Sequence, residues 1–319
     1  MKNFGIALGL LVSAAALWLL FSGLEFGQFL DAFRAANYWS LLPVAFMVLA
    51  GGYLRALRWR WIILPIKRVS PYNAFIAMVI GYMANSLLPV RLGEFVRAHI
   101  IGRRENISRT SAMATIVVER LFDGLSILGV MVVLLLALKL PEQPWLVAAG
   151  WLSLALYLAI LAVILLLNYR RAWTVRTIRR ALGLVPEPLH SQLVKLAESL
   201  IDGFKIVEKG RHLLVITAYS FVIWLVTAYG IYLTAGAFGY QLGFAAAIFV
   251  LVLLIFAVIV PSSPGFVGTF EAGMVYGLML FNIPREAALS MAVVYHLLNT
   301  VPIVILGAYY LWRYNLSLK

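Results

Sequence analysis

Acidic and basic side chains stand close together inside one long apolar segment, residues 110–138. The run VVERLFDGLS places Glu119, Arg120 and Asp123 there. On a helix, Glu119 and Asp123 are four residues apart and share one face, and Arg120 can pair with Asp123 three residues further on. Because ionisable groups inside a membrane are costly, each is a functional candidate. The group predicts either a polar wall of a translocation cavity or a self-neutralising structural cluster.

A second group of charges follows Pro89. The run RLGEFVR sets Arg91, Glu94 and Arg97 on successive turns of a short helix. Two guanidinium groups this close to a chain break could form a fork for a lipid phosphate. Ordinary anchoring at the cytoplasmic surface is the alternative for both arginines, and Glu94 could simply neutralise them.

The run PSSPGFVGTFEAG carries Ser262 and Ser263 before a Pro-Gly break and Glu271 after it. A helix that begins at this break would present free N–H groups and the positive end of its dipole to an anion. Glu271 has no basic residue nearby in the sequence. It therefore needs a distant partner, a proton or a cationic substrate group, unless it is a neutral acid hydrogen-bonded to the backbone.

The last apolar segment contains YHLLNTVP, in which His296 and Asn299 share one helix face ahead of Pro302. His296 can titrate near neutral pH or pair with Glu271, and a packing histidine is equally compatible with the pattern. The four histidines have no metal-ligand spacing, and the chain has no cysteine, no nucleotide-binding loop and no hydrolase motif. We therefore expect no metal, no cofactor and no enzymatic activity, although an intramembrane enzyme remains an alternative.

The elements that must position these side chains are apolar helices. Of 319 residues, 63% are hydrophobic and 12% are charged. Because no soluble surface could hide so much apolar area, the composition predicts an all-α polytopic integral membrane protein. A bilayer core requires about 20 apolar residues per helix. We expect six full transmembrane helices, at residues 4–22, 40–62, 110–138, 145–168, 212–236 and 288–312.

Two further apolar stretches, 72–88 and 244–260, end in segments that contain proline and glycine. If 72–88 crossed the membrane, the basic residues of 55–68 and 91–109 would lie on opposite sides, against the positive-inside rule. A re-entrant helical hairpin that turns at Pro89 keeps both groups in the cytoplasm. The same reasoning makes 244–282 a second re-entrant hairpin, and it places the N-terminus and the C-terminus in the cytoplasm. This topology explains most of the net charge of +13 without nucleic acid.

The order span, broken hairpin, span occurs twice in opposite senses, at residues 40–138 and 212–312. We interpret residues 1–319 as a single membrane domain built on an inverted repeat, with a cytoplasmic amphipathic connector at 169–211. Inverted repeats with interrupted helices are typical of transporters. The sequence GMVYG in the second repeat is a G-x-x-x-G match and predicts only close helix packing.

Three motifs together resemble a known family: NSLLPVRLGEFVRAHII, ATIVVERLFDGLS and PSSPGFVGTFEAG, in this order. They are similar to the lysylphosphatidylglycerol synthetase transmembrane family, a flippase-like family that includes the N-terminal half of the multiple peptide resistance factor. The resemblance covers about residues 5–315 and implies a membrane domain that moves lipids between leaflets. It makes matching motif positions of Arg91, Glu94, Glu119, Arg120, Asp123 and Glu271. The soluble aminoacyl-transferase half has no counterpart here, so lysyl-lipid synthesis is not implied.

We therefore expect a flippase of a bacterial-type cytoplasmic (inner) membrane. It would move a phospholipid, or another anionic or aminoacylated lipid, through a polar cavity between the two hairpins. Arg91 and Arg97 would hold phosphate, while Glu94 and Glu271 would bind a proton or a cationic headgroup. One alternative is a flippase for an isoprenoid-phosphate or glycolipid carrier. The other is a non-transporting membrane partner of a separate synthase or glycosyltransferase.

Overall fold

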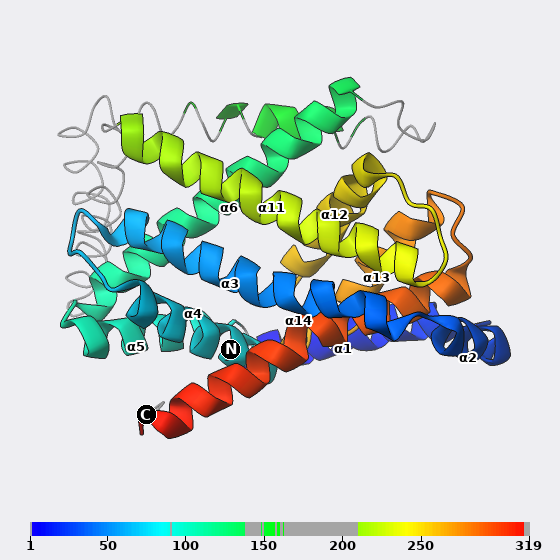
Figure 1. Cartoon of the computed structure of the whole chain (residues 1–319), viewed down its shortest axis with the longest axis horizontal. Coiled ribbons are helices and arrows are strands. Elements are labelled where there is room, and N and C mark those ends of the chain that lie inside the picture. Colours follow the sequence, from blue (N-terminus) through cyan, green and yellow to red (C-terminus); the bar gives the residue numbers. More distant parts are fainter. Residues whose placement is uncertain are drawn as a thin grey trace. The chain divides into compact units, whose positions relative to one another are not determined.

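The computed structural model describes residues 2–89, 91–137 and 210–315, together with parts of 148–162. In these residues all regular secondary structure is helical (Figure 1). In chain order the elements are α1 (Lys2–Phe21), α2 (Phe26–Ala35), η1 (Tyr38–Leu41), α3 (Leu42–Ile63), α4 (Pro71–Leu87), α5 (Gly93–Glu105), α6 (Arg109–Ala137), α11 (Gly210–Ala237), α12 (Phe244–Ile259), η2 (Pro264–Phe266), α13 (Thr269–Met279) and α14 (Arg285–Arg313).

Long helices stand where the sequence predicts most of the spans. The predicted spans 4–22, 40–62, 110–138, 212–236 and 288–312 coincide with α1, α3, α6, α11 and α14. Within the described residues, three helical stretches are long and apolar enough to cross a membrane, Tyr38–Ile63, Gly210–Ala237 and Arg285–Arg313. The bent pair Ala7–Phe21 and Phe26–Ala35 would make a fourth. A helical membrane protein is thus confirmed, while the full number of six spans remains a prediction.

Two parts of the predicted organisation cannot be compared with the structure. The span 145–168 and the connector 169–211 fall largely outside the described residues.

Each predicted hairpin consists of two helices separated by a short break. Helix α4 ends at Leu87 and α5 begins at Gly93, and α12 ends at Ile259 before α13 begins at Thr269. Left-handed backbone occurs in both breaks, at Arg91 with φ 52° and at Phe266 with φ 62°. The breaks therefore lie where proline and glycine predict them. Re-entry on one side of the membrane remains a prediction.

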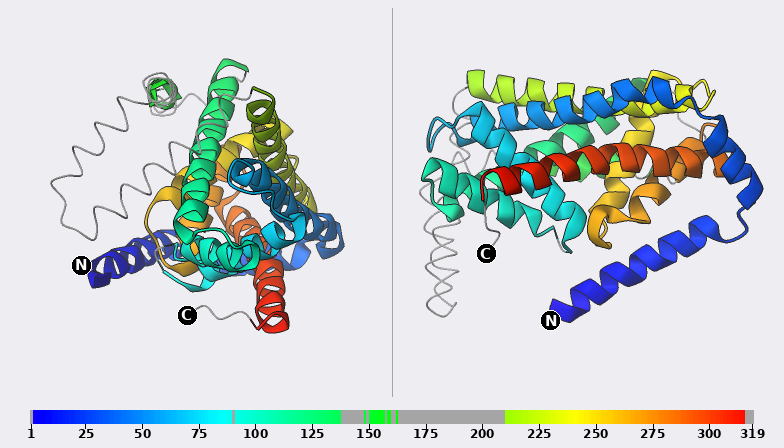
Figure 2. Two further views of the ribbon diagram at one scale, coloured as in Figure 1. Left: turned by 90° about the vertical axis from the view of Figure 1, so that its left-hand side faces the viewer. Right: turned by 60° about the horizontal axis from the view of Figure 1, so that its bottom comes forward.

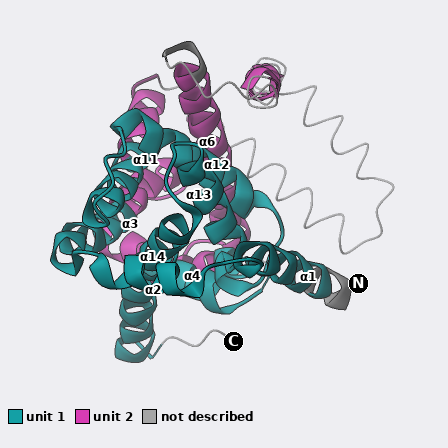
Figure 3. Cartoon of the chain, turned by 90° about the vertical axis from the view of Figure 1, so that its right-hand side faces the viewer, with its two compact units in different colours: residues 1–53, 78–96, 223–319 teal, residues 54–77, 97–222 magenta. Residues whose placement is uncertain are grey.

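The chain divides into two compact units (Figure 3). Unit 1 comprises residues 1–53, 78–96 and 223–319, and unit 2 comprises residues 54–77 and 97–222. The boundaries between the units fall inside α3, α4, α5 and α11 rather than at helix ends. They do not coincide with the limits of the predicted repeats, so the inverted repeat stays a prediction.

In unit 1, glycines bring the two helices of the second hairpin into close contact. A Cβ atom on Gly273 would lie 2.6 Å from the Cβ of Ala257, and one on Gly277 would lie 3.2 Å from the Cα of Val250. Position 273 thus faces 257 and position 277 faces 250, so α13 runs back along α12. The close packing predicted from GMVYG is confirmed.

The first hairpin doubles back in the same way. The N–H of Gly93 donates to Asn85 Oδ1 at 2.8 Å, and a Cβ on Gly93 would collide with the carbonyl of Gly81. The start of α5 therefore lies directly against the second half of α4. Only glycine permits this approach.

The N-terminal helices of unit 1 are joined by a sharp bend, visible at the blue end of the chain in Figure 2. Helices α1 and α2 meet at 90°, and Gly23 adopts φ 71° at the corner. Arg285 closes the open end of α1, because its Nη2 donates to the carbonyls of Leu19, Leu20 and Ser22 at 2.5, 2.9 and 3.0 Å. The carbonyls left unpaired at a helix C-terminus thus find a cationic donor.

In unit 2, Glu105 anchors the end of α5 to the start of α4. Its Oε1 accepts from the backbone N–H of Ser70 at 3.1 Å and from Asn73 Nδ2 at 2.7 Å. The amide oxygen of Asn73 in turn accepts from Arg104 Nε at 2.8 Å. These bonds fix the end of α5 whose earlier turn carries Arg97.

Candidate functional site

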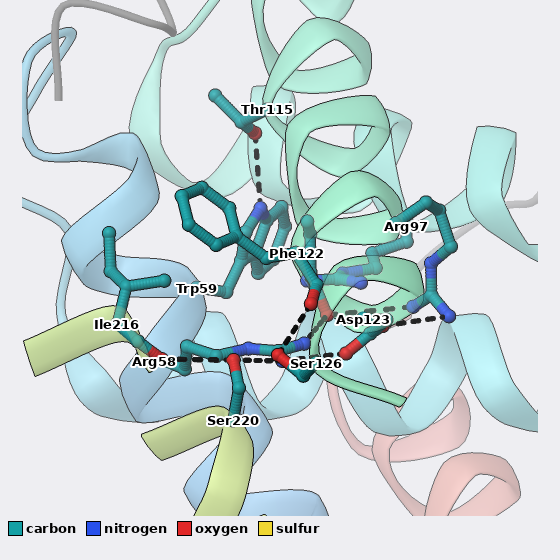
Figure 4. A network of polar contacts seen from close by, with 11 residues as sticks. Arg58, Trp59, Arg97, Thr115, Phe122, Asp123, Ser126, Ile216 and Ser220 are labelled. Carbon is teal, nitrogen blue, oxygen red and sulfur yellow. Dashed lines mark hydrogen bonds and ion pairs between the residues drawn. The ribbon is translucent and has the colours of Figure 1, made fainter. Parts of the chain in front are cut away.

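A fully buried carboxylate, Glu119, is the centre of a cluster of charges in unit 2. Its Oε1 lies 3.1 Å from Arg58 Nη2 and 3.5 Å from Arg120 Nη2, and its Oε2 pairs with Arg97 Nη2. The side chains of Glu119 and Arg58 are both 0% exposed. We define the arginine cluster as Arg58, Arg97, Glu119, Arg120 and Asp123. Figure 4 labels Arg58, Arg97 and Asp123.

Asp123 stands one turn after Glu119 and completes the acidic side of the arginine cluster. Its Oδ1 lies 2.6 Å from Arg58 Nη1, and its Oδ2 lies 3.2 Å from Arg120 Nη1. The pairing of Arg120 with Asp123, predicted from their spacing, is confirmed. Ser220 adds a neutral acceptor, because Arg58 Nη1 donates to its Oγ at 2.9 Å.

Aromatic packing fixes the guanidinium of Arg97. Its Cζ lies 3.6 Å from the ring centroid of Trp59, close enough for a strong cation–π contact. Trp59 is itself held by a hydrogen bond from its Nε1 to Thr115 Oγ1 at 3.0 Å. Both side chains are buried, so Arg97 occupies a fixed position.

The arginine cluster carries an excess of positive charge and of hydrogen-bond donors. Among the described residues, three guanidinium groups face two carboxylates, which leaves one formal positive charge. Within the described residues, several guanidinium nitrogens of the arginine cluster are buried without a hydrogen-bond partner, among them Nε and Nη1 of Arg97 and Nε of Arg58. Buried N–H groups without an acceptor are costly, so this arrangement favours an anion with several acceptor oxygens.

The arginine cluster is not closed on every side. The side chain of Arg120 is 35% exposed and that of Asp123 is 14% exposed, whereas Arg58, Arg97 and Glu119 are almost fully buried. An anion would therefore meet Arg120 first.

A second buried carboxylate, Glu271, lies in unit 1 and pairs with His296. The distance from Glu271 Oε1 to His296 Nδ1 is 2.5 Å, and Glu271 Oε2 accepts from the backbone N–H of Gly268 at 2.7 Å. The ring of Phe270 stacks on the imidazole with centroids 4.1 Å apart. Of the alternatives for His296, the structure shows the pairing with Glu271, and this acid is hydrogen-bonded to the backbone as well.

The other predicted residues near the second break serve local structure. Ser262 Oγ accepts from Thr269 Oγ1 at 3.1 Å, and the backbone N–H of Ser263 donates to Ser13 Oγ at 2.8 Å. Asn299 Nδ2 donates to the carbonyl of Tyr295 at 2.8 Å. These contacts do not themselves assign a binding role.

The residues predicted to form a phosphate fork divide between the two units. Arg91 belongs to unit 1, where its Nη2 donates to the carbonyl of Val258 at 2.6 Å. Arg97 belongs to unit 2 and pairs with Glu119. Glu94 lies partly buried in the first turn of α5. Binding of phosphate by Arg91 and Arg97 remains a prediction.

Sequence reasoning missed Arg58, which bridges both carboxylates of the arginine cluster. A signal was present, because Arg58 falls inside the predicted span 40–62, where a charge is costly. The neighbouring basic residues of 55–68 mask this signal, because together they indicate a cytoplasmic segment. Trp59 and Ser220 carry no comparable signal, since both are common in apolar helices.

These features define a helical membrane protein with broken helices and buried charges. The chain belongs to the family described as the lysylphosphatidylglycerol synthase transmembrane region, whose model matches residues 6–307. Among the described residues, no group of three or more His, Cys, Asp or Glu side chains could hold a metal ion.

Relatives of the chain are found in archaea. A UPF0104 membrane protein of Methanothermobacter thermautotrophicus is 27% identical over 286 residues, which cover 85% of this chain and 82% of the relative. A second such protein of that organism is 25% identical over 94% of this chain and 92% of its own length. A protein named glycosyltransferase AglD, from Haloferax volcanii, is 28% identical over 43% of this chain and 22% of its own length.

Proposed function

We propose that the protein is a lipid flippase that moves a phospholipid, or another anionic or aminoacylated lipid, between the leaflets of a cytoplasmic membrane. The observation that carries this proposal is the set of buried, unpaired N–H groups on Arg58 and Arg97 in the arginine cluster. A headgroup phosphate has the charge and the acceptor oxygens that these groups lack. Family membership supports the same conclusion, because the family is a transmembrane region named for a lipid synthase.

In this proposal the headgroup passes through a polar cavity while the acyl chains stay in the lipid. Arg120, the exposed member of the arginine cluster, contacts the phosphate first, and Arg97 and Arg58 then bind it. Arg91 binds phosphate at the first break. Six full spans, two re-entrant hairpins and cytoplasmic termini complete the proposed topology.

Transport of a fluorescent phosphatidylglycerol in proteoliposomes tests this function. We expect the wild type to flip it, and Arg97→Gln to reduce the rate at least about tenfold, since a phosphate loses a charged hydrogen-bond donor. Arg97→Gln leaves two cations facing two carboxylates in the described arginine cluster, so the protein should still fold. Arg34→Gln, which removes an exposed arginine of α2, is the matched control and should flip like the wild type.

The outcome that would refute the proposal is a rate equal to that of protein-free vesicles for the folded wild type. Equal rates for the wild type, Arg97→Gln and Arg91→Ala would instead remove these residues from the mechanism. An isoprenyl phosphate added as competitor distinguishes the alternative substrate, because a carrier flippase would be inhibited by it and a phospholipid flippase far less.

The relative named as a glycosyltransferase favours a second candidate, a non-transporting membrane partner of a separate transferase. Co-purification of the chain with a soluble transferase, without lipid flipping by the chain alone, would support this candidate.

A further inference from the structure

We propose that Glu271 and His296 form a proton-binding site that controls the second helix break and, through it, the availability of Arg91. This inference rests on the proposed function for the role of Arg91 as a phosphate ligand. The proton site itself stands on contacts within unit 1.

The first step is the contact between the two side chains. Glu271 Oε1 and His296 Nδ1 lie 2.5 Å apart and share a hydrogen bond, so the two groups titrate as one pair. With imidazolium facing carboxylate, or neutral imidazole facing carboxylic acid, the pair is neutral. Loss of one proton leaves the pair with one negative charge.

The second step is the isolation of this pair. Helices α12, α14 and α1 pack against α13. Helix α12 has no ionisable residue, and α1 carries only Lys2 at its first position. On α14 the charged residues besides His296 are Arg285, Glu286 and Arg313 at its two ends. Among the described residues, Tyr295, whose hydroxyl donates to the carbonyl of Thr227 at 3.0 Å, is a further titratable group beside Phe270.

A negative charge on the pair would therefore lie among apolar side chains. Such a charge is costly unless a donor or a cation moves toward it. The chain segment that already donates to the carboxylate is the second break, through the N–H of Gly268. This segment is the element that must respond when the proton leaves.

The third step is the unusual backbone of the break. Gly265, Phe266 and Gly268 have φ values of 69°, 62° and 90°. Left-handed backbone at a phenylalanine costs energy and persists only where surrounding contacts impose it. The hydrogen bond from the N–H of Gly268 to Glu271 is one such contact. A change in the charge of Glu271 therefore alters a contact that keeps Phe266 in its left-handed conformation.

The fourth step connects the break to Arg91, which contacts one residue before it and one residue within it. Its Nη2 donates to the carbonyl of Val258 just before the break, and its Cζ lies 5.2 Å from the ring centroid of Phe266 within the break. Rearrangement of residues 260–268 would alter both contacts. In this proposal Arg91 is held at the break while the pair binds the proton, and proton release frees Arg91 for a phosphate.

A fluorescence titration tests the proton site without any transport measurement. Because the chain has no cysteine, Val267→Cys offers one labelling position in the break, where the side chain is 44% exposed. With an environment-sensitive label in detergent, we expect a pH-dependent fluorescence transition. The transition should be absent in Glu271→Gln and His296→Gln and retained in Glu286→Gln, the matched control on α14. A transition that persists in folded Glu271→Gln, or is absent in Val267→Cys alone, would overturn the inference.

Transport under a pH gradient tests the coupling to lipid movement. We expect the gradient to change the flipping rate of phosphatidylglycerol by about fivefold or more in the wild type and in Glu286→Gln. Glu271→Gln and His296→Gln should flip at one rate with or without the gradient. A gradient response in either variant would contradict the proposed coupling. If the folded wild type does not flip lipid at all, the proposed function fails, and the fluorescence titration alone then decides the proton site.

Discussion

The two units provide hydrogen-bond partners for their charged side chains in different ways. In unit 2, Arg58 and Arg97 pair with carboxylates that project from the interior of α6. In unit 1, Arg91 and Arg285 donate to backbone carbonyls at the ends of α12 and α1. Likewise Glu119 is held by side chains, whereas Glu271 is held both by the side chain of His296 and by a backbone N–H of the second break.

The difference follows from the continuity of the helices. Inside a continuous helix the backbone N–H and C=O groups are paired with one another, so a buried charge must find a side chain of opposite sign. A broken helix leaves N–H and C=O groups unpaired, and these can satisfy a charged side chain directly. The breaks of unit 1 thus provide polar contacts without additional charges, and such contacts can be rearranged by moving a loop.

The largest expected effect is on the folding stability of unit 2. Glu119→Gln removes the carboxylate shared by three arginines, so we expect destabilisation by about 3–5 kcal/mol, the cost of leaving buried charges unpaired. A large drop in the melting temperature in detergent would show this. Glu286→Gln, an acid in the first turn of α14, is the control and should melt like the wild type.

Arg58→Met changes the charge of the arginine cluster in the opposite direction from Glu119→Gln. It leaves two guanidiniums facing two carboxylates in the described arginine cluster, so we expect a smaller loss of stability than in Glu119→Gln. If Arg58→Met lowers the melting temperature more than Glu119→Gln, the net positive charge that we assign to the arginine cluster is wrong.

Close helix packing in unit 1 predicts the next effect. Gly273→Leu would force a side chain against Ala257, and we expect a loss of about 1–3 kcal/mol in stability from overpacking. Gly124→Ala is the control, because nothing lies within 4 Å of a Cβ at Gly124 and alanine favours the helix. Thermal melting of both variants measures the contrast, and equal melting temperatures would argue against the tight α12–α13 contact.

The sequence predicts local features of this fold well. Pro89 with Gly93, and Pro264 with Gly268, mark both breaks because proline and glycine within a few residues of each other favour a helix end, whereas Pro302 alone lies inside α14. The spacing of Arg120 and Asp123 predicts their ion pair because a helix fixes the geometry. Glu271 and His296 could be matched across the chain, since each lacked a partner nearby in the sequence.

Contacts between distant helices could not be predicted in the same way. The bond of Arg58 to Glu119 joins residues 61 positions apart, and the stacking of Arg97 on Trp59 depends on how α3 and α5 pack. No local spacing encodes such contacts. The hydrogen bond from Arg91 to the carbonyl of Val258 could not be predicted either. Its acceptor is a backbone carbonyl near the end of α12, and the sequence does not show which side chain lies close to it.

A smaller effect is expected for the pair in unit 1. Glu271→Gln keeps an acceptor for the N–H of Gly268 but removes the charged partner of His296, so we expect a loss of about 1 kcal/mol. The melting temperature should fall less than in Glu119→Gln. The reverse order would contradict the view that the Glu271–His296 pair is neutral as a whole.

The smallest effect is expected for Arg285→Gln, which removes a charged donor from the partly exposed carbonyls at the end of α1. We expect about 0.5–1 kcal/mol in local stability, seen as faster amide hydrogen exchange in the last turn of α1. Unchanged exchange in that turn would show that Arg285 does not stabilise the helix end.

Native mass spectrometry of the purified protein tests most directly whether the arginine cluster of unit 2 binds an anionic headgroup. We predict that the wild type and Arg34→Gln retain an anionic phospholipid and that Arg97→Gln, purified in folded form, loses most of it. Equal retention of anionic lipid by Arg97→Gln and the wild type would contradict the role of the arginine cluster.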